Sequence, residues 1–560
     1  MTTLTGTGIG LGVAAGPVAR MADPLPAPAD EPSALSPDAE RERAHTALEA
    51  VARELEARGE KAGGLAQEVL EAQAMMAEDP SLADEIDART TTGKTAERAV
   101  HEAFGSFRET LQAMGGYLGE RAADLDDVAG RVIARLRGVP APGVPDPGHP
   151  FVLVARDLAP ADTALLDLDN VLALVTTDGG PTSHTAILAR EKSIVAVVGA
   201  AGATALVDGE TVIVDAAAGA VITQPSADQL ADATRRAADR AAAASAPPTP
   251  GALADGTAVP LLANLGKPGD ADAARALGAE GVGLFRTEFL FLNAEKAPSV
   301  AAQRAEYETL LAGFCGMKVV VRLLDAGADK PLAFLNDADE ENPALGVRGL
   351  RALRAHEQVL RDQLTALAEA DEATRGRGQG ADLWVMAPMV ATVDEAQYIT
   401  DLAHEHGIRT AGVMVEIPAA ALLADRMLAV TDFASIGTND LTQYTMAADR
   451  VLGSVASYQD PWHPAVLRLV GEVGAAGRAQ STPVGICGEA AADPLLALVL
   501  VGLGATTLSM APAALADVRA LLAQHTLDDA RRAAEAALAA TDAAAARAAA
   551  RAAASRTTAA

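Results

Sequence analysis

The amino-acid sequence predicts a multidomain α/β protein whose largest part is a (β/α)8 barrel. Eight strand-like apolar runs follow one another between residues 255 and 526, with helical sequence between them. About 250 residues is a typical length for such a barrel. A smaller set of strand-like runs precedes it, interrupted by a long helical stretch. The length of 560 residues suggests roughly three to four domains. An apolar fraction of 50% with 21% charged residues excludes bulk disorder.

The first predicted unit is a small α/β domain that the chain enters twice. Residues 6–20 are strand-like and punctuated by glycine, and further strand-like runs begin at residues 151, 171, 194 and 211. Between them, residues 37–137 place alanine, leucine and charged residues at helical spacing. We therefore expect an α/β domain built from residues 1–30 and 139–225, with an inserted helical domain at residues 31–138.

The barrel is predicted to follow a linker and to precede an alanine-rich tail. Residues 226–254 read as a helix and a proline-containing linker. The barrel strands are expected near residues 259, 281, 318, 383, 411, 432, 483 and 505. Most of these runs are largely apolar, as is typical of parallel strands buried on both faces. Residues 527–560 are of low complexity, and we expect a last helix with a frayed or disordered end there.

One uncharged segment, from Pro494 to Ala516, is just long enough to cross a bilayer. Because it contains several glycine, threonine and serine residues, we expect a buried helix, a glycine turn and a buried strand instead. Residues 1–19 contain no lysine or arginine, which argues against a secretory signal. The two cysteines, Cys315 and Cys487, cannot form a disulfide framework, so we expect a reducing, cytoplasmic compartment and no membrane partner.

The charge balance restricts the classes of partner. Lysine and arginine number 45 against 75 aspartate and glutamate residues, a formal net charge of −30, and aromatic residues make up only 3%. Nucleic acids and anionic membranes select basic surfaces, so no nucleic-acid partner is expected. The segment from Glu78 to Asp87 holds five acids and no base, which suits a basic protein partner.

Polar side chains gather where the predicted barrel strands end. Because barrel active sites lie at the carboxyl ends of the strands, these side chains are candidates for binding and catalysis. They are Arg286, Arg322, Arg348, Glu416, Asn439, Asp440, Arg450 and Cys487. The arginines suit a small polyanion, because a guanidinium pairs bidentately with carboxylate or phosphate. The carboxylates Glu416 and Asp440 suit Mg²⁺. The alternatives are salt bridges around the rim and a structural role for Cys487.

A histidine motif stands in the small α/β unit. Residues 179–190 read GGPTSHTAILAR, so a strand leads into two glycines and then a helix that Thr182 or Ser183 can cap. His184 falls in the first turn of that helix, where free backbone N–H groups and the helix dipole stabilise an anion. The arrangement suits a histidine that carries a phosphoryl group, and the alternative is a structural histidine.

These motifs together resemble one known family. GGPTSHTAILAR is similar to the phosphohistidine motif of phosphoenolpyruvate-utilising enzymes. Their barrel motifs resemble GVGLFRTEFLF, VVRLLDAGADK, ENPALGVRG, GVMVEIPAA, DFASIGTNDLTQYTMAADR, DPWHPAVLRL and GICGEAA. The order and the lengths resemble the enzyme I family of the bacterial phosphotransferase system over residues 5–525.

The resemblance implies a reaction and a role for each candidate residue. Phosphoenolpyruvate would phosphorylate His184 and leave as pyruvate, and the phosphoryl group would pass to the carrier protein HPr as the first step of sugar phosphotransfer. The implied roles are substrate binding for Arg286, Arg322, Arg348, Asn439, Asp440 and Arg450, Mg²⁺ binding for Glu416 and Asp440, and protonation of the enolate for Cys487. The resemblance also implies a swivelling phosphohistidine domain, a helical HPr-docking domain and a homodimer formed through the barrels.

Four positions depart from the family pattern, and two alternative functions stay open. Pro181, Leu323, Ala328 and Leu452 stand where the family usually has arginine, threonine, glycine and asparagine. None of the four removes a named candidate. One alternative is a pyruvate–phosphate dikinase or phosphoenolpyruvate synthase, which would need a large ATP-binding domain ahead of the histidine domain. The other is a non-catalytic regulator or scaffold that has kept the fold.

Overall fold

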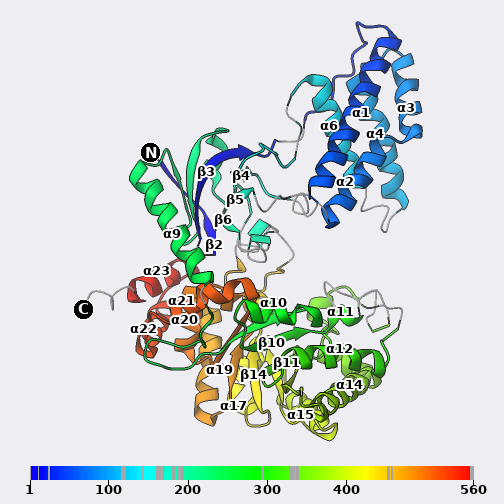
Figure 1. Cartoon of the computed structure of the whole chain (residues 1–560). Helices are drawn as coiled ribbons and strands as arrows, with labels where there is room; N and C mark the ends of the chain where they lie inside the picture. Colours follow the sequence, from blue (N-terminus) through cyan, green and yellow to red (C-terminus); the bar gives the residue numbers. More distant parts are fainter. Residues whose placement is uncertain are drawn as a thin grey trace.

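The structure is a computed structural model of the whole chain. It describes every residue except 1, 11, 23–24, 63, 115–121, 140, 142, 159–165, 167–169, 180–182, 184, 187, 190–193, 246, 292–295, 327–331, 333, 336–339, 451–454, 456–457 and 555–560. The described residues form a mixed α/β protein with a closed barrel of parallel strands, so the predicted fold class is confirmed (Figure 1).

The amino-terminal unit is built on an eight-stranded sheet in the order β1-β8-β7-β3-β4-β5-β6-β2. Its strands are β1 (Thr2–Thr5), β2 (Thr7–Ile9), β3 (Val13–Arg20), β4 (Phe151–Ala155), β5 (Val171–Thr176), β6 (Val195–Val198), β7 (Thr211–Asp215) and β8 (Ala220–Thr223). The central strands β3 to β6 pair in parallel, and the outer strands pair antiparallel. All five residues of β4 are buried, because apolar clusters cover both faces of the sheet.

A helical unit lies in the sequence between two neighbouring strands of this sheet, β3 and β4. Its helices are α1 (Pro37–Ala62), α2 (Gly64–Ala77), α3 (Pro80–Thr91), α4 (Ala96–Met114) and α6 (Ala122–Arg137). They pack side by side around an apolar core that contains Leu55, Ile86 and Phe104 (Figure 1). The chain turns between α2 and α3, where the Asp79 carboxylate caps α3 by accepting from the Ser81 backbone N–H at 2.8 Å.

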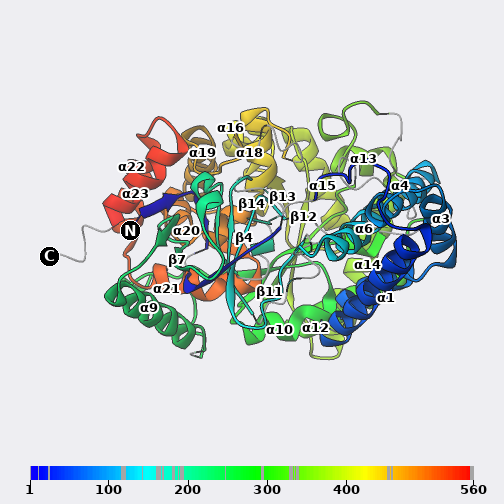
Figure 2. The ribbon, with the colours of Figure 1, turned by 90° about the horizontal axis from the view of Figure 1, so that it is seen from above.

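Helix α9 (Ala227–Ser245) follows the sheet and contacts the barrel unit. It packs on the sheet through Val13, Ile213 and Ala233. Its Arg240 forms a bidentate ion pair with Asp517 of α21 (Leu515–Leu522), with Nε at 2.8 Å from Oδ1. The two helices lie side by side in both views (Figures 1 and 2). The helix predicted within residues 226–254 is confirmed, because α9 spans Ala227–Ser245.

The eight predicted barrel strands all form, and they close in the order β10-β11-β12-β13-β14-β15-β16-β9. The strands are β9 (Leu261–Leu265), β10 (Gly281–Arg286), β11 (Lys318–Arg322), β12 (Asp382–Ala387), β13 (Ala411–Val415), β14 (Phe433–Ile436), β15 (Val484–Ile486) and β16 (Thr507–Met510). Each neighbouring pair is parallel. The surrounding helices before α21 are α10 (Ala271–Ala276), α11 (Glu288–Phe291), α12 (Val300–Gly313), α13 (Leu350–Ala355), α14 (Glu357–Gly376), α15 (Val393–Glu405), α16 (Pro418–Leu422), α17 (Ala424–Met427), α18 (Thr438–Met446), α19 (Pro464–Gln480) and α20 (Pro494–Leu503).

The uncharged segment near the carboxyl end is a helix, a turn and a strand, as predicted. Helix α20 ends at Leu503, Gly504 turns the chain with φ at +117°, and β16 follows. The left-handed conformation at this C-cap favours glycine because it has no side chain to clash. Within the described part of the chain, we find no helix with the length and apolarity that a membrane span requires.

The alanine-rich tail differs from the expectation of a last helix with a frayed or disordered end. Through residue 554 it forms two helices, α22 (Leu527–Leu538) and α23 (Ala543–Ala554), that pack on the barrel unit (Figure 1). Ala546, Ala550 and Ala554 are buried at four-residue spacing. A methyl group is small enough to let helices approach closely, so alanine alone supplies the packing face here. Strands β1 and β8 were also not predicted.

Candidate active site

A cavity of about 480 Å³ opens at the carboxyl ends of the barrel strands. Its lining includes all eight candidate residues that the sequence analysis drew from the strand ends: Arg286, Arg322, Arg348, Glu416, Asn439, Asp440, Arg450 and Cys487. The parallel closure of the barrel brings these side chains together, although they are spread over some 200 residues of sequence.

Two of the arginines are held by carboxylates. Arg322 contacts Glu288 at 2.6 Å and Asp325 at 3.3 Å, and Arg348 contacts the same Asp325 carboxylate at 2.9 Å. Burial alone would lower the pKa of Arg322, but the charges of Glu288 and Asp325 outweigh it and raise that pKa. Both arginines therefore stay charged, and their planes are oriented by short contacts.

Arg286 differs from these two arginines. It ends β10 at the cavity wall, and within the described part of the chain its guanidinium forms no hydrogen bond or ion pair. Burial lowers its pKa, and the positive charge of Arg322 adds to that effect. A guanidinium that lacks a protein partner in a cavity is ready to bind an anionic ligand.

Glu416 and Asp440 form the carboxylate side of the cavity. Glu416 follows β13 and is 1% exposed, and its Oε2 accepts the backbone N–H of Met389 at 2.8 Å. Met389 has φ at +57°, a strained conformation for a side chain of this size. Asp440 lies in the first turn of α18, and Arg348 contacts it at 3.3 Å.

The chemistry of this carboxylate pair fits a divalent cation. Burial, followed by the negative charges of Asp440 and Asp325, raises the pKa of Glu416 to about 8. A cation between Glu416 and Asp440 would relieve this repulsion, and Mg²⁺ is commonly held by one or two carboxylates together with substrate oxygens. No group of three or more histidine, cysteine, aspartate or glutamate side chains able to hold a metal occurs among the described residues.

Asn439 and Glu489 join two neighbouring strand ends. The Glu489 backbone N–H donates to Asn439 Oδ1 at 3.0 Å, and Asn439 Nδ2 lies 3.5 Å from Glu489 Oε1. The backbone of Arg450 is held in turn, because its N–H donates to Gln443 Oε1 at 2.9 Å. The loops after β14 and β15 are therefore tied to each other at the cavity.

Cys487 follows β15 and is 2% exposed. Its thiol lies 3.6 Å from the carbonyl oxygen of Ile436, and the Ser435 side chain also hydrogen-bonds to it. Burial raises the pKa of Cys487 to about 11. The sulfur therefore carries its proton at neutral pH, as a proton donor must.

The predicted nucleophile His184 lies outside the described residues, as do Pro181, Thr182, Ala328 and Leu452. The residues on either side of His184 are described. Ser183 Oγ accepts the Ala186 backbone N–H at 3.3 Å, so Ser183 caps the turn. Thr185 Oγ1 donates to Asp157 at 2.6 Å and accepts the Leu158 backbone N–H at 3.1 Å. These bonds hold the motif against the loop after β4.

Three of the five acids between Glu78 and Asp87 have structural partners. Asp79 caps α3, Glu85 pairs with Arg89, and Asp87 lies 2.7 Å from His45. Glu78 and Asp84 are exposed and have no partner within the described part of the chain. The free acidic charge is thus smaller than the composition of the segment suggests.

Two further carboxylates of the site received no role in the sequence analysis. Glu288 is 2% exposed and lies two residues beyond Arg286, and its Oε2 has no hydrogen-bond partner among the described residues. Asp325 stands three residues after Arg322. Their spacing from arginines at strand ends was the available signal, but only the folded barrel shows which arginines they contact.

Comparisons with known proteins show the family of the chain. Family models of PEP-utilising enzymes match three segments: the PEP-binding domain at residues 240–527, the N-terminal domain at 5–121 and the mobile domain at 147–219. The phosphoenolpyruvate-protein phosphotransferase of Streptomyces coelicolor is 54% identical over 96% of this chain and 97% of its own length. The protein of the same name from Haloferax volcanii is 40% identical over 86% of each chain.

A solved structure is also similar to part of the chain. The NMR solution structure of Enzyme I (nEIt) is 33% identical and covers 42% of this chain and 98% of its own, with a TM-score of 0.36. The family models and the long relatives cover nearly all of the sequence that carries the candidate residues. This chain belongs to the family of phosphoenolpyruvate-protein phosphotransferases, which are PEP-utilising transferases.

Proposed function

We propose that the protein transfers the phosphoryl group of phosphoenolpyruvate to His184, releases pyruvate, and then passes the phosphoryl group to the carrier protein HPr. The observation that carries this proposal is the single cavity lined by four arginines, two acidic side chains suited to a cation, and a buried thiol. Phosphoryl transfer requires positioning and neutralisation of charge, and this set of groups supplies both.

In this reaction Arg286, Arg322, Arg348 and Arg450 would bind the phosphate and carboxylate of the substrate, and Asn439 would contact the phosphate. Arg286 is the side chain with the most freedom to do so, because it has no hydrogen bond or ion pair to any described residue. Arg322 and Arg348 are already oriented by Asp325, so less side-chain freedom is lost when the substrate binds.

Glu416 and Asp440 would hold Mg²⁺ with the substrate. When bound, Mg²⁺ neutralises charge on the phosphoryl group. The pairing of a deeply buried carboxylate with a second one at the cavity wall supports this assignment. Asp440 also contacts Arg348, so it lies between the proposed cation and the substrate-binding arginines.

The chemical step breaks the P–O bond of phosphoenolpyruvate and forms a P–N bond to a ring nitrogen of His184. The electron pair of the broken bond stays with the enolate oxygen. The carbon at position 3 of the enolate then takes the proton of the Cys487 thiol, which leaves pyruvate and a thiolate. A buried thiol that is neutral at physiological pH is suited to this role.

The domains predicted from the sequence assign substrate binding, histidine phosphorylation and carrier docking to separate parts of the chain. We propose a swivelling phosphohistidine domain at residues 1–30 and 139–225, a docking domain at 31–138, a linker at 226–254 and a barrel at 255–526. His184 must visit the barrel mouth and then the carrier, so movement between these domains is required. We also propose a homodimer formed through the barrels, and a molar mass measured by light scattering tests that assembly.

Carrier docking is proposed for the exposed surface of α2 and α3. Met75 of α2 is 67% exposed, Glu78 lies in the turn directly after α2, and Asp84 lies on α3. An exposed apolar side chain with acidic side chains near it suits a carrier that has basic residues around an apolar patch. Glu78→Lys should weaken phosphoryl transfer to HPr while leaving phosphorylation of the enzyme unchanged. Asp228→Lys, an exposed acid on α9, is the matched control.

Intact-mass analysis after incubation with phosphoenolpyruvate and Mg²⁺, without ATP, tests the main proposal. One acid-labile phosphoryl group should appear on the enzyme together with free pyruvate. The His184→Ala variant should form neither product, and its melting temperature should equal that of the wild type. A phosphorylated His184→Ala sample would move the nucleophile elsewhere. A folded wild-type sample that forms no pyruvate would favour the non-catalytic scaffold.

A further inference from the structure

A group of polar side chains, which we call the column, lines a small cavity inside the barrel below Cys487. Most of the barrel interior is apolar, with Leu284, Val320, Met386, Met414 and Phe433 packed together. Four side chains with hydroxyl or amine groups also face this interior, from strands on opposite sides of the barrel. They are Lys318 of β11, Ser435 of β14 and Thr507 and Ser509 of β16. Polar groups in an apolar core are expensive to bury, so their alignment calls for a role.

The upper end of the column is the Cys487 thiol. The Ser435 hydroxyl hydrogen-bonds to the sulfur, and this bond opposes the effect of burial by lowering the pKa of the thiol. The backbone of Cys487 is fixed separately, because Asn264 Nδ2 donates to its carbonyl oxygen at 3.0 Å. Asn264 is held in turn by the Ser509 hydroxyl, which donates to Oδ1 at 2.5 Å. Ser435 is thus the one of these residues that contacts the sulfur itself.

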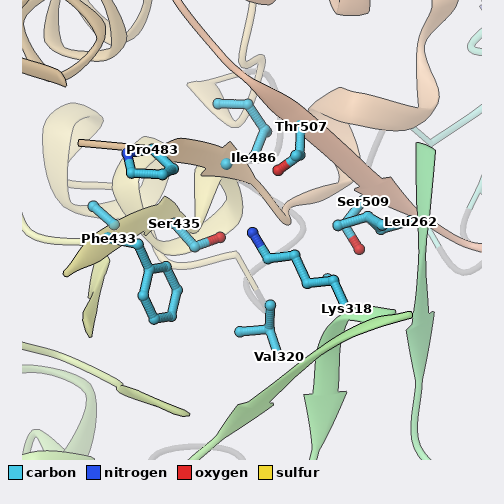
Figure 3. Close-up of a pocket in the computed structure, with 12 residues that line it drawn as sticks. Leu262, Lys318, Val320, Phe433, Ser435, Pro483, Ile486, Thr507 and Ser509 are labelled. Atoms are coloured by element: carbon cyan, nitrogen blue, oxygen red, sulfur yellow. The ribbon is translucent and has the colours of Figure 1, made fainter. Parts of the chain in front are cut away.

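Below Ser435 the barrel holds a small cavity of about 10 Å³. This is close to the space that one water molecule requires, and polar partners line it. Figure 3 shows the Lys318 amine extending toward the Ser435 hydroxyl, with Thr507 and Ser509 across the cavity. A Cβ at Gly485 would lie 2.8 Å from Thr507 Oγ1, so the glycine keeps this space open.

The lower end of the column is Lys318, the first residue of β11, which is half-buried at the amino end of the barrel. Its ammonium lies 3.3 Å from the Trp384 ring centroid and 5.8 Å from that of Phe433. The negative charge of Asp382 partly opposes the effect of burial on the pKa of Lys318. The Asp382 carboxylate also accepts a hydrogen bond from the Trp384 indole N–H at 2.8 Å. Among the described residues the ammonium forms no hydrogen bond or ion pair. Burial lowers the pKa of Lys318 to about 8, so the amine can both release and take up a proton near neutral pH.

We propose that this column returns protons to Cys487 through the barrel, with Ser435 as the group next to the sulfur and Lys318 as the group that meets solvent. The inference rests on the proposed role of Cys487 as the acid that protonates the enolate. It extends that role, because an acid that is buried beneath bound substrate needs a second route by which to recover its proton.

Each turnover moves one proton along the proposed route. The thiol gives its proton to carbon 3 of the enolate and becomes a thiolate. The Ser435 hydroxyl gives its proton to the sulfur and takes one from a water molecule in the cavity. That water takes a proton from the Lys318 ammonium, and the neutral amine then takes one from solvent at the amino end of the barrel. In the first of these steps the C=C electron pair of the enolate forms the new C–H bond and the carbonyl of pyruvate is restored. Each later step moves a proton between S–H, O–H and N–H groups only.

The test measures how quickly the transferable proton of the full-length enzyme exchanges with solvent. Enzyme saturated with phosphoenolpyruvate in H₂O without Mg²⁺ is diluted into D₂O that holds the same substrate concentration, and Mg²⁺ is added after increasing delays to start turnover. Mass spectrometry then reports whether the methyl group of the first-turnover pyruvate carries hydrogen or deuterium. In Ser435→Ala, which removes one oxygen atom, the exchange half-time should lengthen by about 10-fold or more, within the range of effects of a positioned proton-transfer group. Lys318→Met should show the same effect.

Control variants separate this proposal from the proposed function and from a structural role. Thr400→Val removes an equally buried hydroxyl that bonds within α15, and it should behave as wild type. Lys318→Arg keeps a cation over Trp384 but cannot release a proton, so it should exchange slowly. A wild-type half-time in Ser435→Ala, Lys318→Met or Lys318→Arg overturns the column. Unchanged proton transfer in Cys487→Ala instead overturns the acid role itself. Equal melting temperatures exclude misfolding as the cause.

Discussion

Arg348 and Asp325 form a two-point ion pair at the mouth of the barrel, with Nη2 at 2.9 Å from Oδ2 and Nε at 3.4 Å from Oδ1. The same Asp325 carboxylate lies 3.3 Å from Arg322. One acidic side chain therefore orients two of the four arginines that we propose to bind phosphoenolpyruvate. Burial would raise the pKa of Asp325, but the two arginines outweigh it and hold that pKa below its usual value.

Replacing this carboxylate should weaken substrate binding. Asp325→Asn removes a charged hydrogen-bond acceptor from both arginines, and such bonds contribute about 1.5 to 3 kcal/mol each. We expect phosphoenolpyruvate to bind about 10- to 100-fold more weakly, which steady-state kinetics and calorimetric titration would measure. Glu308→Gln is the matched control, because Glu308 also bridges two arginines, Arg304 and Arg377, on the outside of the barrel. An equal loss in both variants would contradict a specific role for Asp325.

The role of Asp325 also shows what the sequence could not reveal about the site. The strand-end positions of the arginines were predictable, because parallel strands of a barrel place their carboxyl ends at one face. The pairing of Asp325 with Arg348 depends on the path of the intervening chain. Glu288 is a similar case, since it begins a short helix and contacts Arg322, which is 34 residues away. Local patterns identify candidate groups, but these contacts arise from tertiary packing.

The two cysteines should differ in their reaction with an alkylating reagent. Only the thiolate reacts, and the pKa of Cys487 is raised to about 11, so its thiolate is scarce at pH 8 and increases as the pH approaches 11. Cys315 is exposed, and Cys487 is buried. Peptide mapping after iodoacetamide treatment at pH 8 should show label on Cys315 and little on Cys487. In urea both residues should react, and equal labelling of the folded protein at pH 8 would refute the prediction.

Removing the thiol should slow turnover more than it weakens binding. Cys487→Ala leaves Arg286, Arg322 and Arg348 in place, so the affinity for phosphoenolpyruvate should change little. Loss of a proton donor typically costs about 10²- to 10⁴-fold in rate, and we expect pyruvate formation to fall within that range. Coupled assay of pyruvate, together with calorimetric titration of the substrate, separates the two effects. Unchanged turnover would remove Cys487 from the proposed role as acid.

Most of the fold was predictable, and the exceptions have physical reasons. The barrel strands lie within largely apolar runs and are mostly buried, which makes them recognisable. Strands β1 and β8 have four residues each and pair with one another across the whole first unit, Thr2 opposite Thr223. β1 is a polar and largely exposed edge strand, and β8 has one buried residue, so neither carries a clear apolar pattern. In the tail, alanine at nearly every position conceals which methyl groups are buried.

The packing of the tail on the barrel unit makes a stability prediction at Gly502. This residue lies in α20, and a Cβ there would lie 2.1 Å from the backbone oxygen of Ala530 in α22. Because a backbone atom cannot move aside as a flexible side chain can, Gly502→Ala should lower the free energy of unfolding by about 1 to 3 kcal/mol. Gly471→Ala in α19 is the matched control, since its added methyl group would meet only an ordinary contact, 3.5 Å from Leu503. Thermal and denaturant unfolding of both variants should show a loss of stability for Gly502→Ala and none for Gly471→Ala. If the two variants unfold alike, then α22 does not pack against α20 in solution, and the tail beyond residue 526 is independent of the barrel.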